Sequence, residues 1–204
     1  MTGTMGGPDA EAYFSGLYSE SEDPWLLRDR WYERRKRALT LAALPEEHYV
    51  RAYEPGCANG ELTLALAARC DSLLAADLNA DAVALARKRV AHLSHVQVEQ
   101  RAMPDNWPDG DFDLIVISEV AYYLNDSQLN ALVDRVKASH SERGTLLVCH
   151  WRKPIEGWPH AGDYVHERLG ELMDWPSISH YQDDDFLLDV WSPEGTSVHG
   201  REGR

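Results

Sequence analysis

One short run of the sequence, YEPGCANGELT from Tyr53 to Thr63, sets a carboxylate and two glycines between an apolar stretch and a helix-forming one. Gly56 allows the chain to turn sharply, and Gly60 lets the backbone approach a ligand with no Cβ in the way. Asp77 follows about 20 residues after Gly56, the separation at which a carboxylate accepts hydrogen bonds from both hydroxyls of a ribose. Together with Glu54, these residues indicate a turn that binds a ribose-containing ligand.

The glycine spacing disfavours an NAD-dependent oxidoreductase. The dinucleotide fingerprint GxGxxG places glycines at its first, third and sixth positions, and the sequence has Gly56, Ala58 and Glu61 there. Only the first of them matches. Two structural interpretations stay open. The glycine turn could serve packing alone, and Asp77 could cap the next helix, although Asn79 can also perform that task.

The elements around this turn alternate between short apolar runs and helical periods. Strands are expected over 50–55, 72–78, 96–101, 112–118 and 144–151, and helices over 61–70, 81–93, 126–140 and 163–173. The runs 177–182 and 186–192 are so closely linked that they must pair antiparallel. This order predicts an open α/β sheet, mostly parallel, with helices on both faces. Ligands bind such sheets at the carboxyl ends of the strands, where residues 56–60 lie, and a helix over 23–45 could cap that edge.

Length and charge limit the class of protein. The 204 residues are enough for one domain, and a formal net charge of −14 disfavours nucleic acid and anionic membranes as partners. No apolar run reaches the length of a membrane span. Three widely spaced cysteines, with no CxxC pair, predict a reduced, cytoplasmic protein, and no metal site is expected. We expect a flexible leader over 1–22, one domain over 23–192 and a flexible tail over 193–204, as a monomer or homodimer.

Two further segments extend the pattern of the glycine turn. Arg101, Ala102 and Met103 follow the third strand, and the run PDGDFDLIVISEV covers residues 108–120. With the turn and Asp77, in this order and spacing, they resemble the class I S-adenosylmethionine (SAM) methyltransferases. The resemblance implies a Rossmann-like, seven-stranded, mostly parallel sheet with an antiparallel last strand, SAM as cofactor and S-adenosylhomocysteine as product. The cofactor residues that it implies are Glu54, Gly56, Cys57, Gly60, Asp77, Leu78, Ala102, Met103 and Ser118. Many relatives carry an acidic residue where Arg101 stands, so the contact to the adenine amino group is in doubt.

A narrower resemblance comes from four other segments. They are DPW (23–25), WYERRKR (31–37), SEVAYYL (118–124) and HWRKP (150–154). Over residues 23–191 the chain is similar to the methyltransferases named after the rhizobial nodulation protein S (NodS). That resemblance implies N-methylation of the free amine of a small molecule, such as an amino sugar. In nodulation protein S the acceptor is the terminal amine of a deacetylated chitooligosaccharide.

Residues near the carboxyl ends of the fourth and fifth strands are the candidates for catalysis. An amine attacks when it is neutral, so a carboxylate or imidazole could take its proton. Glu119, Tyr123 and His150 are the candidate catalytic residues, although packing roles for Tyr123 and His150 are as plausible. The candidate acceptor contacts are Tyr122, Trp151, Asp163 and His166. Trp25 and Tyr32 could face the sulfonium, whereas Arg34 to Arg37 are interpreted as mostly a solvated helix face.

Two rival functions stay open. A SAM-dependent O-methyltransferase would need a stronger base or a metal, because a hydroxyl loses its proton less readily than an ammonium does. A non-catalytic SAM-binding subunit is the rival of a different class, since Ala58 replaces the usual central glycine.

Overall fold

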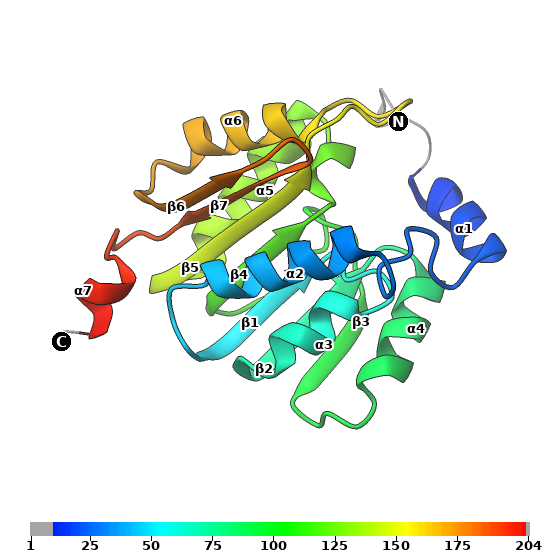
Figure 1. Ribbon diagram of the computed structural model, residues 1–204, viewed down its shortest axis with the longest axis horizontal. Coiled ribbons are helices and arrows are strands. Elements are labelled where there is room, and N and C mark those ends of the chain that lie inside the picture. The colour runs from blue at the N-terminus through cyan, green and yellow to red at the C-terminus, as the bar shows by residue number, and fades with distance from the viewer. Residues whose placement is uncertain (1–9, 203–204) are drawn as a thin grey trace.

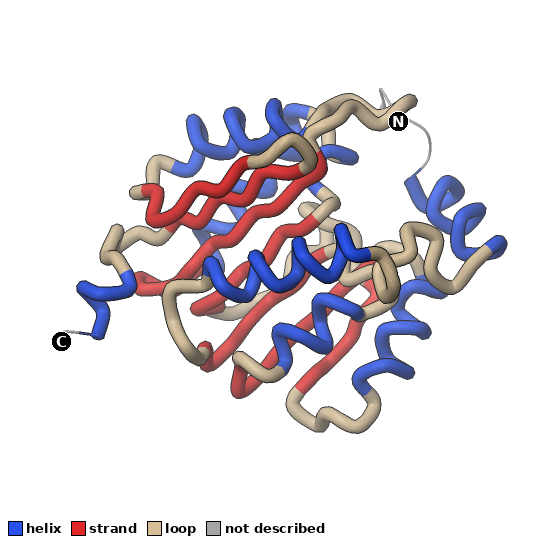
Figure 2. The backbone as a smooth tube through the Cα atoms, in the orientation of Figure 1, coloured by secondary structure: helices blue, strands red, loops and turns tan. Residues whose placement is uncertain are grey.

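The computed structural model describes residues 10–202, and the sheet in that part of the chain has seven strands. Figure 2 shows them as one continuous twisted layer. Along the sheet the order is β3-β2-β1-β4-β5-β7-β6, with β7 antiparallel to both of its neighbours and the other pairs parallel. The strands are β1 Tyr49–Pro55, β2 Cys70–Asp77, β3 Val96–Gln100, β4 Phe112–Ser118, β5 His140–Trp151, β6 Ser177–Gln182 and β7 Phe186–Trp191. The predicted α/β class and mostly parallel sheet are confirmed.

Helices cover both faces of this sheet (Figure 1). On one face lie α2, α3 and α4, and on the other α5 and α6. Their bounds are α2 Trp31–Ala43, α3 Glu61–Ala67, α4 Ala80–Val90, α5 Asp126–Ser139 and α6 Gly162–Met173. A 3-10 turn, η1 (Ala121–Tyr123), leads from β4 into α5, and α1 (Ala10–Glu20) and α7 (Val198–Glu202) lie near the two ends.

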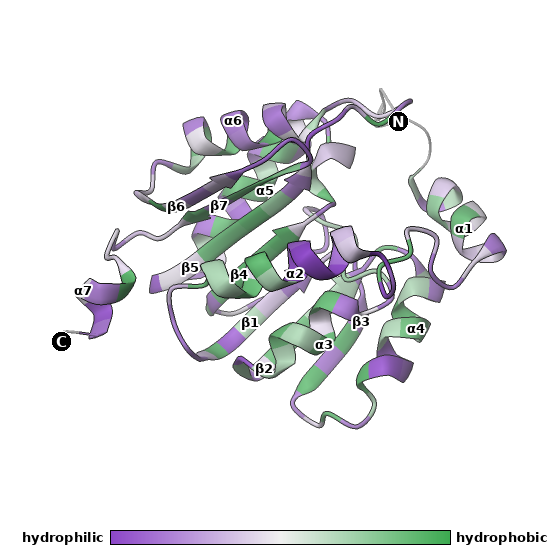
Figure 3. Ribbon diagram, viewed as in Figure 1, coloured by the Kyte–Doolittle hydropathy of each residue, from purple (hydrophilic) through white to green (hydrophobic). Residues whose placement is uncertain are grey.

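Strand β4 shows why the sheet is buried on both sides. Ile115 and Ile117 pack in the core under α5 and α6, while Leu114 and Val116 pack in the opposite core under α2 and α3. Successive side chains point to opposite faces, so a strand covered on both faces must be apolar throughout. Figure 3 shows the same apolar character along most of β4 and in the middle of β5. The central strands therefore hold their carboxyl ends rigidly at one edge.

The N-terminal region differs from the prediction in two ways. The expected helix over 23–45 is helical only from Trp31, because residues 24–30 form turns in which Asp23 accepts from the amides of Leu27 and Arg28. The expected flexible leader was wrong for residues 10–20, which form α1, and residues 1–9 lie outside the described part. Tyr18 of α1 is buried with its ring 5.8 Å from that of Trp25. This aromatic contact joins α1 to the turns before α2, and Ser15 of α1 accepts from Asn79, the N-cap of α4.

The expected flexible tail was also wrong for residues that the structure describes. Arg201 in α7 is buried and forms an ion pair with Glu46 at 2.5 Å. Its guanidinium also donates to the carbonyl of Thr196 and to Ser192 Oγ. A buried guanidinium is stable only when its donors are paired. Arg201 thus fastens α7 to the loop before β1.

None of the helices over residues 10–202 combines the length and the apolar character needed to cross a membrane.

Candidate functional site

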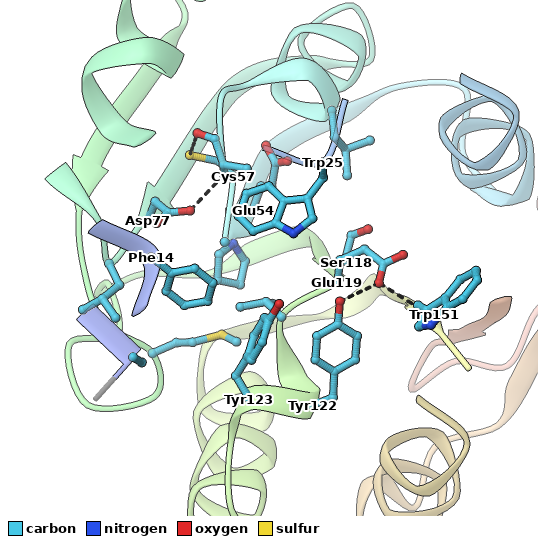
Figure 4. A pocket seen from close by; sticks show the side chains of 18 of the residues that line it. Phe14, Trp25, Glu54, Cys57, Asp77, Ser118, Glu119, Tyr122, Tyr123 and Trp151 are labelled. Carbon is cyan, nitrogen blue, oxygen red and sulfur yellow. Dashed lines mark hydrogen bonds between the residues drawn. The ribbon is translucent and has the colours of Figure 1, made fainter. Parts of the chain in front are cut away.

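A cavity of about 610 Å³ opens at the carboxyl ends of β1, β2 and β4, with α1 and α2 over it. Figure 4 shows side chains from these elements converging on it. Of the candidate site residues, all but Gly60, His150, Asp163 and His166 line it. The lining candidates are Trp25, Tyr32, Glu54, Gly56, Cys57, Asp77, Leu78, Ala102, Met103, Ser118, Glu119, Tyr122, Tyr123 and Trp151. The structure therefore brings fourteen of the candidate residues together around one cavity.

The two glycines of the turn have different tasks. Gly56 has φ +79°, and a Cβ added there would lie 2.9 Å from Val120 Cβ. Gly60 has φ +82°, and its Cβ would lie 3.0 Å from the Cα of Ala86 in α4. Only glycine adopts such a backbone conformation readily. Gly56 lets the turn pack closely against Val120, which also lines the cavity. Gly60 lies beneath the turn and lets α3 approach α4, a packing role rather than the predicted direct contact.

Asp77 fixes the shape of the turn and faces the cavity. Its Oδ2 accepts from the amide of Ala58 at 2.9 Å, and its Oδ1 accepts from the amide of Asn79 at 2.9 Å. Burial raises the pKa of Asp77, while these amides oppose the rise. Asn79 caps α4 by accepting from the amides of Asp81 and Ala82. The helix-cap interpretation of Asp77 is thereby set aside, and its carboxylate stays available to a ligand in the cavity.

Glu54 offers an unsatisfied acceptor to the same cavity. The residue is 2 % exposed, and its Oε2 has no hydrogen-bond partner among residues 10–202. Burial, with the nearby charge of Asp77, raises the pKa of Glu54 to about 8. A buried polar atom without a partner is costly. Glu54 therefore suits a cationic donor such as the amino group of SAM.

Glu119 lies at the centre of a hydrogen-bonded cluster. Its backbone is left-handed, with φ +58°. Oε1 accepts from Lys36 Nζ at 2.5 Å, and Oε2 accepts from Tyr122 Oη at 2.8 Å and from the Trp151 amide at 2.9 Å. Figure 4 shows the last two contacts. Both carboxylate oxygens are thus engaged, and Glu119 orients Lys36, Tyr122 and the Trp151 amide; its role as general base stays a prediction.

Lys36 is the main residue that the sequence interpretation missed. It is 5 % exposed, although the run from Arg34 to Arg37 was interpreted as a mostly solvated face. Glu33 Oε2 lies 2.9 Å from its Nζ, and the ring centroid of Tyr32 lies 4.7 Å away. Burial disfavours the ammonium, but Glu119 and Glu33 outweigh it and raise the pKa of Lys36. The sequence did carry a signal for this burial. Tyr32, Lys36 and Thr40 follow one another at intervals of four residues, which places them on one face of the helix.

An aromatic wall closes the acceptor side of the cavity. Phe14 of α1 lies with its ring 5.0 Å from that of Tyr123 in η1, and Trp158 lies 4.6 Å from the same tyrosine. Tyr13 contacts Trp158 at 5.2 Å. Sequence reasoning missed three of these rings. Tyr13 and Phe14 fell in the expected leader, and Trp158 lies in a loop with no periodic pattern.

The geometry is that of a known family. The family model described as nodulation protein S (NodS) matches residues 17–164. This chain belongs to the nodulation protein S family. The protein from Rhizobium tropici is 34 % identical over 107 residues, covering 52 % of this chain and 45 % of its own length. The chain thus spans about half the length of that curated relative.

Two solved structures extend the NodS comparison. The N-methyltransferase NodS from Bradyrhizobium japonicum, in complex with S-adenosylhomocysteine, has a TM-score of 0.79 and 27 % identity, over 87 % of this chain and 96 % of that one. A protein from Pseudomonas syringae, assigned to the methyltransferases, has a TM-score of 0.72 and 50 % identity, over 80 % and 99 % respectively. The predicted class I methyltransferase fold is confirmed by these likenesses.

Besides Gly60, three predicted site residues of this NodS-family chain lie outside the cavity. His150 is fully buried, and its Nε2 accepts from the Ala121 amide at 3.0 Å, so it does not reach a substrate. Asp163 is exposed and paired with Arg152 at 2.8 Å. His166 is buried between His150 and β7. The predictions of direct catalysis by His150 and of acceptor contacts by Asp163 and His166 were wrong, because α6 turns His166 inward toward His150 and β7 and leaves Asp163 exposed.

The adenine side of the NodS-like cavity differs at Arg101. Leu78, Ala102 and Met103 line this side, as predicted. Arg101 lines it too, and its Nε lies 2.6 Å from Glu99 Oε2. The ion pair holds the guanidinium beside the cavity. No group of three or more metal-ligand side chains is arranged to hold an ion in the part of the chain that the structure describes.

Proposed function

We propose that this chain is a SAM-dependent methyltransferase that methylates the free amine of a small molecule such as an amino sugar. The observation that carries the proposal is the pair of acidic side chains at one turn. Asp77 holds the turn through two amides, and Glu54 presents a buried oxygen with no partner among the described residues. The family's N-methyltransferase NodS, in its complex with S-adenosylhomocysteine, supports the same interpretation.

The cofactor half of the cavity suits SAM residue by residue. Asp77 would accept from the ribose hydroxyls, and Glu54 would accept from the amino group. Gly56 lets the turn pack against Val120 in the cavity wall, and Met103 and Leu78 would cover the adenine. Bound SAM supplies a methyl group on a sulfonium, so the protein mainly provides orientation and excludes water.

The acceptor half suits a cation that gives up its proton before it reacts. Two carboxylates, Glu33 and Glu119, surround the single ammonium of Lys36, which leaves one net negative charge beside Tyr122 and Tyr123. This charge attracts an ammonium. Since Glu119 already accepts from three donors, the site is better suited to an amine that is in part neutral in solution than to an alcohol that needs a strong base.

Mass spectrometry after incubation with SAM tests the reaction. We expect a mass gain of one methyl group on chitooligosaccharides that carry one free amine, and none on their fully acetylated counterparts. Methylation of hydroxyl acceptors instead would favour the O-methyltransferase alternative. Tight SAM binding without transfer to any amine or hydroxyl would favour the non-catalytic subunit.

Cofactor binding by Glu54 predicts a proton release. At pH 7 the Glu54 carboxyl, with its pKa raised to about 8, is mostly protonated. Pairing with an ammonium requires the carboxylate, so SAM binding should expel about one proton at pH 7, and its affinity should rise with pH up to about 8. Calorimetry in buffers of different ionisation enthalpy measures this release. Glu54→Gln should abolish it, and a wild-type protein that binds SAM without releasing a proton would contradict the assignment.

A further inference from the structure

A buried series of hydrogen-bonded side chains, called here the histidine chain, runs from η1 to Asp189 in β7. The Ala121 amide donates to His150 Nε2 at 3.0 Å, and His150 Nδ1 lies 3.2 Å from His166 Nε2. His166 Nδ1 lies 2.5 Å from Asp189 Oδ2. Its three side chains come from β5, α6 and β7 and do not line the cavity. Nothing in the proposed methyl transfer uses them directly.

Hydrogen-bond directions along this chain are fixed from both ends. The Ala121 amide can only donate, so His150 Nε2 must be unprotonated and its Nδ1 must carry the hydrogen. Nδ1 of His150 then donates to Nε2 of His166. The remaining nitrogen of His166, Nδ1, carries its hydrogen toward the Asp189 carboxylate, which can only accept. Each member therefore requires the tautomer of the next.

At its first member, His150, the histidine chain holds the turn η1, which carries two tyrosines of the cavity wall. Ala121 begins η1, and Tyr122 and Tyr123 complete it. The Tyr122 ring lies 5.2 Å from the His150 ring, and the hydroxyl of Tyr122 donates to Glu119. Fixing the Ala121 amide thus fixes the direction of both tyrosines.

The packing of α6 shows that the close approach of this helix to His150 is built into the fold. A Cβ on Gly162, the first residue of α6, would lie 2.2 Å from the Trp151 carbonyl oxygen and 3.1 Å from His150 Cβ. Only glycine allows the helix so close to the end of β5. One turn later, the helix presents His166 to His150.

We propose that His166 and Asp189 are positioning residues for acceptor methylation. They hold His150 in the tautomer that accepts the Ala121 amide, and so set the direction of Tyr122 and Tyr123. The proposal rests on the proposed function for its catalytic consequence. The chain is no proton path, because its inner end is a backbone amide that neither gains nor loses a proton in the reaction.

Ring-nitrogen NMR and amide exchange test the chain without an acceptor. In the wild type we expect His150 Nε2 unprotonated and Nδ1 protonated. His166→Leu removes the acceptor of His150 Nδ1, and the Ala121 amide should then exchange about ten- to a hundredfold faster. His166→Gln, whose amide can both accept and donate, should restore exchange to within about threefold. His92→Leu, at an exposed histidine, is the matched control.

The same variants separate the positioning role from simple structural damage. In His166→Leu, kcat for the acceptor should fall about tenfold or more below the wild-type value, while SAM affinity should stay within about twofold of the wild type. His166→Gln should recover the wild-type kcat. A protonated His150 Nε2, or unchanged exchange in His166→Leu, would overturn the proposal. So would an equal loss of SAM affinity and kcat. If the wild type methylates no acceptor, the proposed function fails, while the exchange comparison still decides whether the chain holds η1.

Discussion

Replacement of Lys36 by methionine is expected to lower the free energy of unfolding by about 3–5 kcal/mol. Lys36 Nζ lies 2.9 Å from Glu33 Oε2 and 2.5 Å from Glu119 Oε1, and the lysine is almost fully buried. Without its ammonium, two carboxylates are left close together with no cation between them. Urea denaturation, followed by circular dichroism, measures the change. Methyl transfer should fall with it, since Glu119 loses the contact that holds its Oε1.

Two variants sharpen this measurement. Lys88→Met on α4 makes the same substitution at an exposed position and should change stability by less than about 0.5 kcal/mol. Combining Lys36→Met with Glu33→Gln removes one of the two opposed carboxylates and should restore part of the loss. If Lys36→Met were as stable as Lys88→Met, the cluster would not be an ionic one.

Asp77→Ala is expected to weaken SAM binding by about a hundredfold or more. The carboxylate has two functions, holding the turn through the Ala58 and Asn79 amides and accepting from the proposed ribose hydroxyls. Both are lost together. Isothermal titration calorimetry with SAM measures the affinity.

Asp71→Ala is the matched control for that experiment. Asp71 lies on the same strand, and its partner is His48, an exposed pair far from the cavity. SAM affinity should be unchanged in this variant. An Asp77→Ala protein that binds SAM as tightly as Asp71→Ala would exclude the ribose assignment.

Most of the fold could be predicted because its signals are local. In β4, the apolar run that follows Asp113 indicates burial on both faces, and the strand begins and ends at the predicted residues. Helix ends were less certain where capping depends on one residue. The cap of α5 is Asn125, in a capping box with Gln128, rather than the Asp126 that follows it. Neighbouring polar side chains compete for such a cap, and the loop conformation decides between them.

In the candidate site, too, the features with local sequence signals could be predicted, and the contacts between distant residues could not. The cofactor side comes from β1, β2 and their turn, where glycines and acidic residues have fixed spacing, so the sequence indicated it. On the acceptor side, Lys36 meets Glu119 across 83 residues of chain, and Phe14 meets Tyr123 through a helix placed in the expected leader. Charge and aromaticity along the sequence do not reveal which partner each side chain meets. The sequence alone does not distinguish a buried lysine from a solvated one; the positions of Glu33 and Glu119 in the fold do.

The origin of the aromatic wall affects how members of this family can diverge. Tyr13 and Phe14 lie before residue 17, where the match to the family model begins. They belong to α1, which stands at the margin of the sheet (Figure 1). Tyr13 and Phe14 belong to none of the hydrophobic cores, so exchanging these two rings would leave the cores untouched, whereas Ser15 and Tyr18 of the same helix contact Asn79 and Trp25. On the proposed function, exchanging these two rings changes the shape of the cavity with little cost to folding, so substrate range can drift while the methyl donor stays the same.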